Sequence, residues 1–158
     1  MKHSKQFRRA ESGRNEPGRL PRALVIVYAL AALLALAGLA DATYLTVQYL
    51  SGETAVCGGS ADCFRVLGSP YSKIGAVPVS GLGVLAYFAV FACATFAAFN
   101  YQRARNWFAL FVSAMFLGTL WFLFVQTFLL HAFCRYCLFS AAIVFLLTGL
   151  VVATPRRV

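Results

Sequence analysis

Four long apolar stretches dominate the pattern of hydrophobic and polar positions. They cover residues 23–40, 79–99, 107–130 and 133–153. Each is close to the ~20 residues with which an α-helix crosses about 30 Å of hydrocarbon at 1.5 Å per residue. The pattern therefore predicts an all-α membrane protein built as a bundle of four transmembrane helices.

The segment between the first two stretches, residues 51–78, is rich in Gly, Ser and Pro. Ser69 suits a helix N-cap, Pro70 the first helical position and Gly75 the stop, and Pro78 follows. The loop is therefore expected to carry a short interfacial helix. This helix serves either as a lid over the bundle or only as an anchor on the membrane surface.

Residues 1–20 are polar and basic and show no periodicity. They predict a disordered tail ahead of a single membrane domain over residues 21–158. Ala40-Asp41-Ala42 resembles a signal-peptidase site, but the preceding apolar run exceeds the usual ~7–15 residues of a signal peptide. We therefore interpret the first stretch as a transmembrane helix.

Charge changes the picture by fixing an orientation. The net charge is +9, yet only 12% of residues are charged, against about 25% in soluble domains. Eleven of the fourteen Lys and Arg residues precede the first span, separate the second from the third, or follow the fourth; the others are Arg65, Lys73 and Arg135. Positive loops stay cytoplasmic. We expect a multi-pass protein of the cytoplasmic (inner) membrane with both termini cytoplasmic, and no nucleic-acid binding.

The chain has five cysteines, at positions 57, 63, 93, 134 and 137. An odd count leaves at least one thiol unpaired within the chain. In the predicted orientation Cys57, Cys63, Cys134 and Cys137 lie at the outer surface, where disulfides are permitted. Cys93 lies in the cytoplasmic half of the second span and is expected to be a small buried apolar residue.

Cys134-Arg135-Tyr136-Cys137 forms the expected first turn of the fourth helix. Free N–H groups, the helix dipole and Arg135 favour a thiolate there. Cys137 lies about 4.5 Å deeper along the axis. We expect Cys134 to face water and Cys137 the bundle interior, an arrangement that suits a dithiol which exchanges with protein thiols outside and an apolar oxidant inside.

The other pair, Cys57 and Cys63, flanks Gly58-Gly59-Ser60-Ala61-Asp62. Glycine gives such a segment the freedom that a disulfide shuttle requires. Two alternatives remain: structural disulfides, or a zinc site. The zinc site is disfavoured because five residues separate this pair, more than the usual two to four.

In this order the motifs resemble the vitamin K epoxide reductase family in its bacterial, stand-alone form. A loop cysteine pair follows the first span, and a C-x-x-C opens the fourth. Between them, Cys63-Phe64-Arg65-Val66-Leu67-Gly68-Ser69 matches the family's Cys-x-x-Val-x-x-Ser. The resemblance covers about residues 23–153. It implies a four-helix bundle that holds a quinone, ubiquinone or menaquinone, near its outer end.

The resemblance also implies roles. Cys57 takes electrons from a thioredoxin-like (DsbA-type) protein, Cys63 relays them to Cys134, and Cys137 faces the quinone. Ser69 lies by the loop and the quinone pocket, and no metal takes part. Because the sequence ends at Val158 without a thioredoxin-like domain, the partner is expected to be a separate protein.

Two positions depart from the family's vertebrate members. These place an asparagine where Val79 aligns, next to Ser80, and a tyrosine where Ala141 aligns. Polar contacts to a quinone therefore cannot be assigned by transfer, and an epoxide substrate is not implied.

The sequence also fits two rival functions. A DsbB-type oxidase also has four spans, but it carries the C-x-x-C in its first outer loop, which is the reverse order. A non-catalytic scaffold with structural disulfides is the second rival. Two polar residues allow a chemical role or a structural one. Asp41 could exchange protons or be an interfacial carboxylate, and His131 could titrate or simply lie at the interface. Gln126 is expected to bond to a neighbouring helix.

Overall fold

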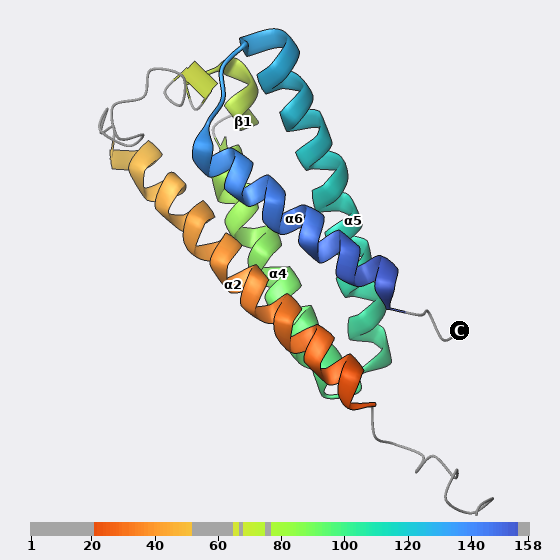
Figure 1. Ribbon diagram of the computed structural model, residues 1–158. Coiled ribbons are helices and arrows are strands. Elements are labelled where there is room, and N and C mark those ends of the chain that lie inside the picture. Colours follow the sequence, from red (N-terminus) through yellow and green to blue (C-terminus); the bar gives the residue numbers. More distant parts are fainter. Residues whose placement is uncertain (1–20, 52–64, 67, 75–76, 155–158) are drawn as a thin grey trace, which may run out of the picture.

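The computed structural model describes residues 21–51, 65–66, 68–74 and 77–154 (Figure 1). Four helices are long and apolar enough to cross a membrane, which confirms the predicted bundle. They are α2 (Arg22–Ser51), α4 (Val79–Ala98), α5 (Gln102–Phe124) continued by the π-helical turn η3 (Val125–Leu130), and α6 (Arg135–Ala153). The predicted tail, Cys57 and Cys63 lie outside the described residues.

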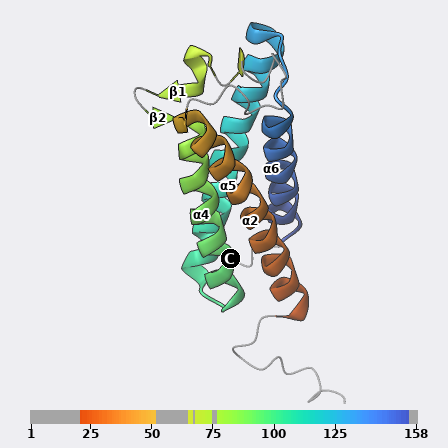
Figure 2. The ribbon, with the colours of Figure 1, turned by 90° about the vertical axis from the view of Figure 1, so that its left-hand side faces the viewer.

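Small residues let α2 and α4 pack closely, side by side along most of their length (Figure 2). On α2 the buried positions recur three or four residues apart, and on α4 the same spacing places a matching row against them. The α2 row includes Ala31, Ala35 and Gly38; a Cβ at Gly38 would overlap the ring of Tyr87. Such small-residue seams are how membrane helices gain packing contacts without a hydrophobic driving force between them.

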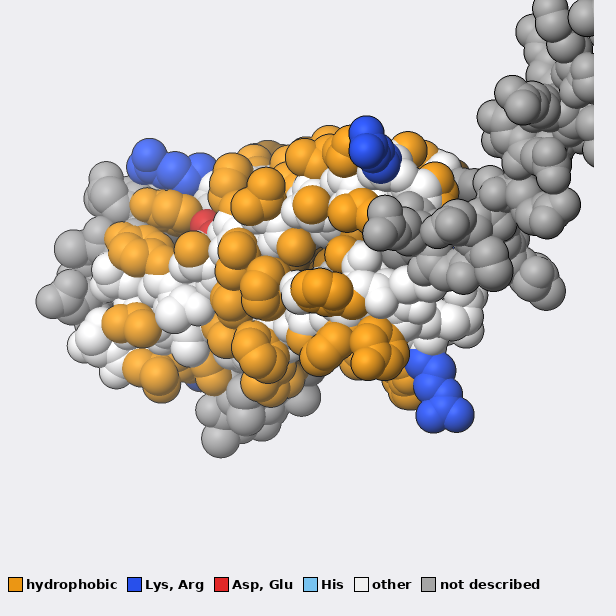
Figure 3. All heavy atoms as spheres, turned by 90° about the horizontal axis from the view of Figure 1, so that it is seen from below, with side chains coloured by type: hydrophobic (Ala, Val, Ile, Leu, Met, Phe, Trp, Pro, Cys, Tyr) orange, Lys and Arg blue, Asp and Glu red, His pale blue; other side chains and the backbone are white. Residues whose placement is uncertain are grey.

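Large apolar side chains cover the outside of the bundle. Leu33, Leu85, Leu117 and Val152, one on each helix, are all more than 60% exposed. Figure 3 shows such side chains over the middle of one face, with Lys and Arg toward the two ends. An exposed apolar area of this extent is foreign to a soluble monomer and fits contact with lipid.

α2 is longer than its apolar run predicts. The run ends at Ala40, but the helix continues for eleven residues to Ser51. Hydropathy falls after Ala40 because polar residues begin there. The helix persists because Leu45 is buried, and the hydroxyls of Thr43 and Thr46 are satisfied by carbonyls one turn back without breaking the helix. Asp41 therefore lies within a continuous helix and not at the end of one.

The outer loop holds a shorter helix than expected. Ser69 occupies the N-cap position and Pro70 the first turn, as predicted, but the 3₁₀-helix η2 (Pro70–Ser72) ends before Gly75. Two short strands follow, β1 (Lys73–Ile74) and β2 (Val77–Pro78), paired antiparallel. The backbone of Lys73 and Ile74 bonds across this hairpin, which replaces the remaining helical turns.

Segments that the charge pattern assigns to the same side of the membrane lie at the same end of the bundle. The start of α2, the turn between α4 and α5, and the end of α6 lie toward one end (Figure 1). Arg105 at the start of α5 donates to the Tyr28 hydroxyl on α2 at 3.1 Å. η2, the hairpin and the start of α6 lie at the opposite end. Which end faces the cytoplasm stays a prediction.

Candidate active site

Cys134 begins α6 as its N-cap residue. Its Sγ accepts the backbone N–H of Cys137 at 3.5 Å, in the place where Ser or Asp usually satisfies a first-turn donor. The C-x-x-C therefore opens the fourth transmembrane helix, as predicted. The helix geometry brings the Cys134 sulfur to the first turn and sets Cys137 one turn further along.

The expectation that Cys134 faces water is wrong. Its exposed fraction is 0%, and it packs in a small cluster with Val66 and Ala132, which are also fully buried. Val66 belongs to the outer loop, so a segment far earlier in the sequence covers this sulfur. Nothing in the C-x-x-C itself reveals such a cover.

The Cys134 thiol is an acidic one. A hydrogen bond with the Cys137 side chain lowers the pKa of Cys134 to about 7, and the backbone N–H groups of Cys137 and Tyr136 act in the same direction. Burial opposes the shift, and so does the negative charge of Asp41. Near neutral pH a substantial fraction of reduced Cys134 is thus thiolate, the form that attacks disulfides.

Gln126 holds the cysteine turn from the neighbouring helix. It lies in η3, is 1% exposed, and its Oε1 accepts the backbone N–H of Cys134 at 3.2 Å. The Gln126 carbonyl also accepts the N–H of Ala132 at 3.2 Å. His131 ends the π-helical turn with positive φ, 47°, and is exposed. π-Helical turns are frequent at functional sites, and this one ties α5 to the C-x-x-C.

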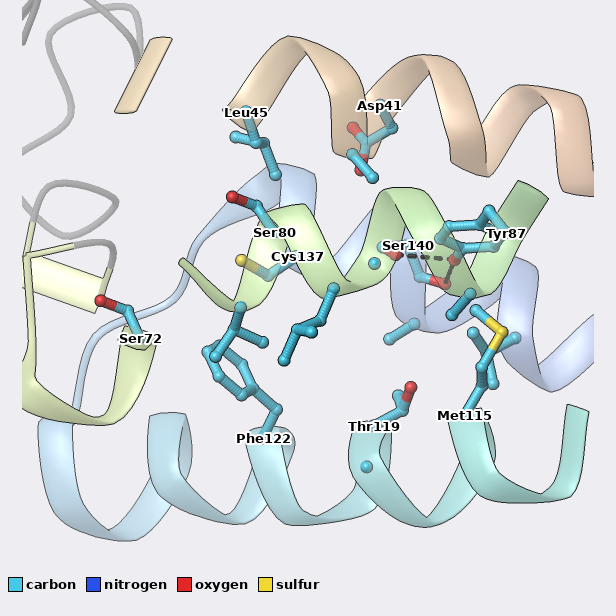
Figure 4. A pocket seen from close by; sticks show the side chains of 18 of the residues that line it. Asp41, Leu45, Ser72, Ser80, Tyr87, Met115, Thr119, Phe122, Cys137 and Ser140 are labelled. Carbon is cyan, nitrogen blue, oxygen red and sulfur yellow. Dashed lines mark hydrogen bonds between the residues drawn. The ribbon is translucent and has the colours of Figure 1, made fainter. Parts of the chain in front are cut away.

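A cavity of about 390 Å³ lies next to Cys137, between the four helices. Figure 4 shows side chains entering it from all sides, among them Asp41, Tyr87, Phe122 and Cys137. Most of the lining is apolar, and its larger side chains include Leu45, Leu82, Phe111, Met115, Phe122, Leu123 and Val144. Cys137 therefore has one side on the cysteine turn and the other on an apolar chamber, as the sequence predicts.

The polar groups of the cavity are few and are spread over its wall. Tyr87 is 2% exposed, and its hydroxyl bonds the Ser140 hydroxyl at 2.7 Å and the Ser140 carbonyl at 3.1 Å (Figure 4). Asp41 also lines the cavity, and its Oδ2 is buried without a hydrogen-bond partner. The remaining ones are Tyr49, Ser72, Ser80, Thr119 and Gln126.

Ser69 is not among the residues that line the cavity. It is buried, and its hydroxyl donates to the Val66 carbonyl at 2.8 Å. Ser72, one turn later, donates to the Ser69 carbonyl and does reach the cavity wall. Ser69 thus supports the segment that covers Cys134, and a direct contact between Ser69 and a quinone stays a prediction.

Cys93 lies apart from the site. It is half-buried on α4, packs against the main core cluster and does not line the cavity. Its contacts with the core agree with the predicted small apolar role, but its burial is partial where full burial was predicted. The described residues contain no group of three or more His, Cys, Asp or Glu side chains that could hold a metal ion.

The amino-acid sequence that forms this site matches the model of a known family. The family model described as "Vitamin K epoxide reductase family" matches residues 29–152. The chain belongs to the vitamin K epoxide reductase family. Membership makes it a membrane protein of an oxidoreductase type that links thiols with quinones. No curated protein sequence matches the chain.

The chamber fits a quinone head group. Its volume falls within the ~300–1,000 Å³ typical of small-molecule sites, and its apolar walls carry a few polar groups, as such sites do. Val79 and Ala141, where vertebrate members of the vitamin K epoxide reductase family carry asparagine and tyrosine, both line it. Ser80 and Ser140, one residue away in each case, also line it. Hydroxyl groups are therefore present beside both substituted positions.

Sequence reasoning missed Tyr87, Ser140, Ser72 and Thr119 as site residues. Ser140 carried a usable signal, because it lies three residues after Cys137 and so on the same helix face. Tyr87 and Thr119 lie on helices with apolar residues all round, so no periodicity marks their inner faces. Ser72 lies in the short helix of the outer loop, where no periodicity can be read. Gln126 was considered, but only as a helix-to-helix bond.

Proposed function

We propose that this protein is a membrane thiol–quinone oxidoreductase that reoxidises a thioredoxin-like (DsbA-type) protein outside the cytoplasm. Two electrons pass from the partner through Cys57, Cys63, Cys134 and Cys137 to a membrane quinone, ubiquinone or menaquinone. The net result is a disulfide in the partner and so support for oxidative folding. The protein lies in the inner membrane with both termini in the cytoplasm and its redox cysteines on the outer face.

The observation that carries the proposal is the position of the two cysteines of the C-x-x-C. Cys134 has an acidic thiol and is buried under the outer loop, whereas Cys137 lines the chamber. A purely structural disulfide needs neither an acidic thiol nor a ligand-sized chamber behind it. The arrangement places the Cys134 sulfur for thiol exchange and the Cys137 sulfur at the apolar chamber.

The cover over Cys134 supports a relay and opposes direct attack by the partner. Val66 contacts the Cys134 cluster, and Cys63 precedes Val66 by three residues. At no more than about 3.6 Å per residue, the chain holds the Cα atoms of Cys63 and Val66 within about 11 Å of each other. The proposed relay uses this short tether to bring Cys63 to the sulfur that Val66 covers.

On the chamber side, residues of this chain orient the cysteine turn and exclude water. A bound quinone supplies an acceptor for two electrons and two protons. Gln126 fixes the turn that carries Cys134, and Phe111 and Phe122 provide flat apolar walls. Because the chamber is apolar, water is kept from the sulfur of Cys137 while the disulfide of the C-x-x-C forms again.

The test uses purified protein, a reduced thioredoxin-like protein and a soluble quinone analogue. We expect quinone reduction that depends on both partners, and loss of at least about 100-fold in rate when any one of Cys57, Cys63, Cys134 or Cys137 is changed to Ala. Cys93→Ala is the matched control and keeps the rate. A wild-type protein that stabilises its bundle through these disulfides but reduces no quinone would instead favour the scaffold.

A further inference from the structure

Asp41 is the one acidic residue within the transmembrane helices, since the others, Glu11, Glu16, Glu53 and Asp62, lie outside them. A carboxyl group is costly at such a position and usually pairs with another group. Asp41 lines the chamber, and its Oδ2 is buried without a hydrogen-bond partner. A buried polar atom without a partner calls for a ligand or a chemical role.

The surroundings of Asp41 leave it free to exchange a proton. Among the described residues that line the chamber, the titratable ones besides Asp41 are Tyr49 on α2, Tyr87 on α4 and Cys137 on α6, and none is Lys, Arg or His. α5 and η3 contribute only neutral polar groups, Thr119 and Gln126. The Tyr87 hydroxyl is held by Ser140. None of these described lining residues is a cation that would hold Asp41 in its charged form.

Asp41 and the cysteine pair are also electrostatically linked. Both Asp41 and Cys137 point into the chamber, from α2 and α6 (Figure 4). The negative charge of Asp41 reaches as far as Cys134, whose pKa it raises against the larger effect of the Cys137 hydrogen bond. A change in the protonation of Asp41 is therefore felt by the redox pair, and the reverse also holds.

The geometry points to Asp41 as the proton carrier between Cys137 and the quinone, a role that rests on the proposed function. Cys134 starts as thiolate and Cys137 as thiol. Asp41 takes the proton from the Cys137 S–H, the S–S bond between Cys134 and Cys137 forms, and the electron pair goes to the quinone. Asp41 then gives its proton to one quinone oxygen, and the second proton comes from water on the outer side. The products are the disulfide, the quinol and an unchanged Asp41.

Asp41→Asn tests this because it keeps the size and polarity of the side chain but carries no acid proton. In single-turnover reduction of a soluble quinone analogue by dithiol-reduced protein, we expect a rate loss of at least about 100-fold, as for loss of a general acid or base. Asp41→Glu should retain the rate within about tenfold. Thr43→Ala, an exposed position two residues along the same helix, is the matched control and keeps the wild-type rate.

Two further measurements separate proton transfer from binding. The affinity of Asp41→Asn for the quinone analogue should stay within about threefold of wild type; an affinity more than tenfold weaker would make Asp41 a binding residue and overturn the proposal. In quinone-free protein, infrared difference spectra between the oxidised and reduced cysteine pair should show a carboxyl stretching band that is absent from Asp41→Asn.

The proposed function and the role of Asp41 can be overturned separately. A wild-type protein that reduces no quinone contradicts the proposed function, whatever the infrared band shows. Wild-type turnover with an equally fast Asp41→Asn leaves the proposed function intact and overturns the role of Asp41. A wild-type infrared spectrum with no carboxyl band also overturns the role of Asp41, since Asp41 then does not respond to the redox state of the cysteines.

Discussion

The side-chain oxygen of Gln126 accepts the backbone N–H of Cys134 at 3.2 Å, so that α5 holds the first residue of the redox turn on α6. Both residues are buried, and Gln126 also lines the chamber. One side chain therefore contacts both the cysteine turn and the space proposed for the quinone.

Gln126→Leu should destabilise the protein by about 1–3 kcal/mol, because it removes the side-chain acceptor of a buried N–H. We also expect slower quinone reduction, since the cysteine turn loses its anchor. Thermal unfolding in detergent and steady-state rates measure the two effects. Thr127→Val, an exposed neighbour on η3, is the control and should change neither by much. A Gln126→Leu protein of wild-type stability would show that the bond contributes nothing.

The acidity of Cys134 can be measured directly. In protein without Cys57, Cys63 and Cys93, the ¹³C NMR shift of the reduced Cys134 Cβ should titrate near pH 7. Changing Cys137 to Ala removes the largest stabilisation of the thiolate, so the pKa of Cys134 should rise toward the ordinary thiol value. Thiolate-dependent exchange at pH 7 should fall with it. An unchanged midpoint in the Cys137→Ala protein would assign the acidity to the backbone N–H groups alone.

Gly38 is expected to tolerate no larger residue. A Cβ there would overlap the Tyr87 ring, so Gly38→Leu must push apart α2 and α4 and displace the Tyr87 hydroxyl from Ser140. Overpacking of this kind costs about 1–3 kcal/mol. Gly149→Ala is the control, since nothing lies within 4 Å of a Cβ at that position. If thermal unfolding shows both variants equally stable, the close α2–α4 seam is not required.

The relay predicts a trapped intermediate. Cys57→Ala leaves Cys63 without its loop partner, so a Cys63–Cys134 bridge should accumulate, and more fully when Cys137 is also changed to Ala. Trypsin cleavage at Arg103 or Arg105 then leaves two fragments joined by this bridge on a denaturing gel without reductant. Reductant should separate them. Fragments that separate without reductant in both variants would rule out communication between the two cysteine pairs.

The proposed orientation predicts which thiols are reachable from outside the cell. After mild reduction of intact cells, a membrane-impermeant thiol reagent should label Cys57 and Cys63. Cys93 in the span serves as the internal control and should not be labelled before the membrane is broken. Labelling of the loop pair only in broken membranes would reverse the orientation and, with it, the disulfide-forming role.

The sequence predicts the bundle well because each span is a continuous apolar run. It places the end of α2 too early because polar residues from Asp41 onward lower the hydropathy without breaking the helical hydrogen bonds. The sequence also predicts a longer interfacial helix than the structure has, for a related reason. Ser69, Pro70 and Gly75 are local signals, whereas the pairing of Lys73–Ile74 with Val77–Pro78 forms a hairpin instead.

The site was harder to predict than the fold. The C-x-x-C and its place at the start of a helix follow from spacing alone. The burial of Cys134 does not, because its cover, Val66, comes from a distant part of the chain. The inward direction of Tyr87, Asp41 and Gln126 depends on how the four helices rotate against one another, and apolar residues around each helix leave that rotation undetermined in the sequence.

The π-helical turn Val125–Leu130 has an evolutionary consequence. A π-turn accommodates one residue more than an α-turn, and each residue rotates a helix by about 100°. Deletion of one residue after Gln126 would thus turn the segment that leads to Cys134 by about 100° and move the Cys134 N–H away from Gln126. We expect homologues without the extra residue to hold that N–H with another group, or to carry a looser redox turn.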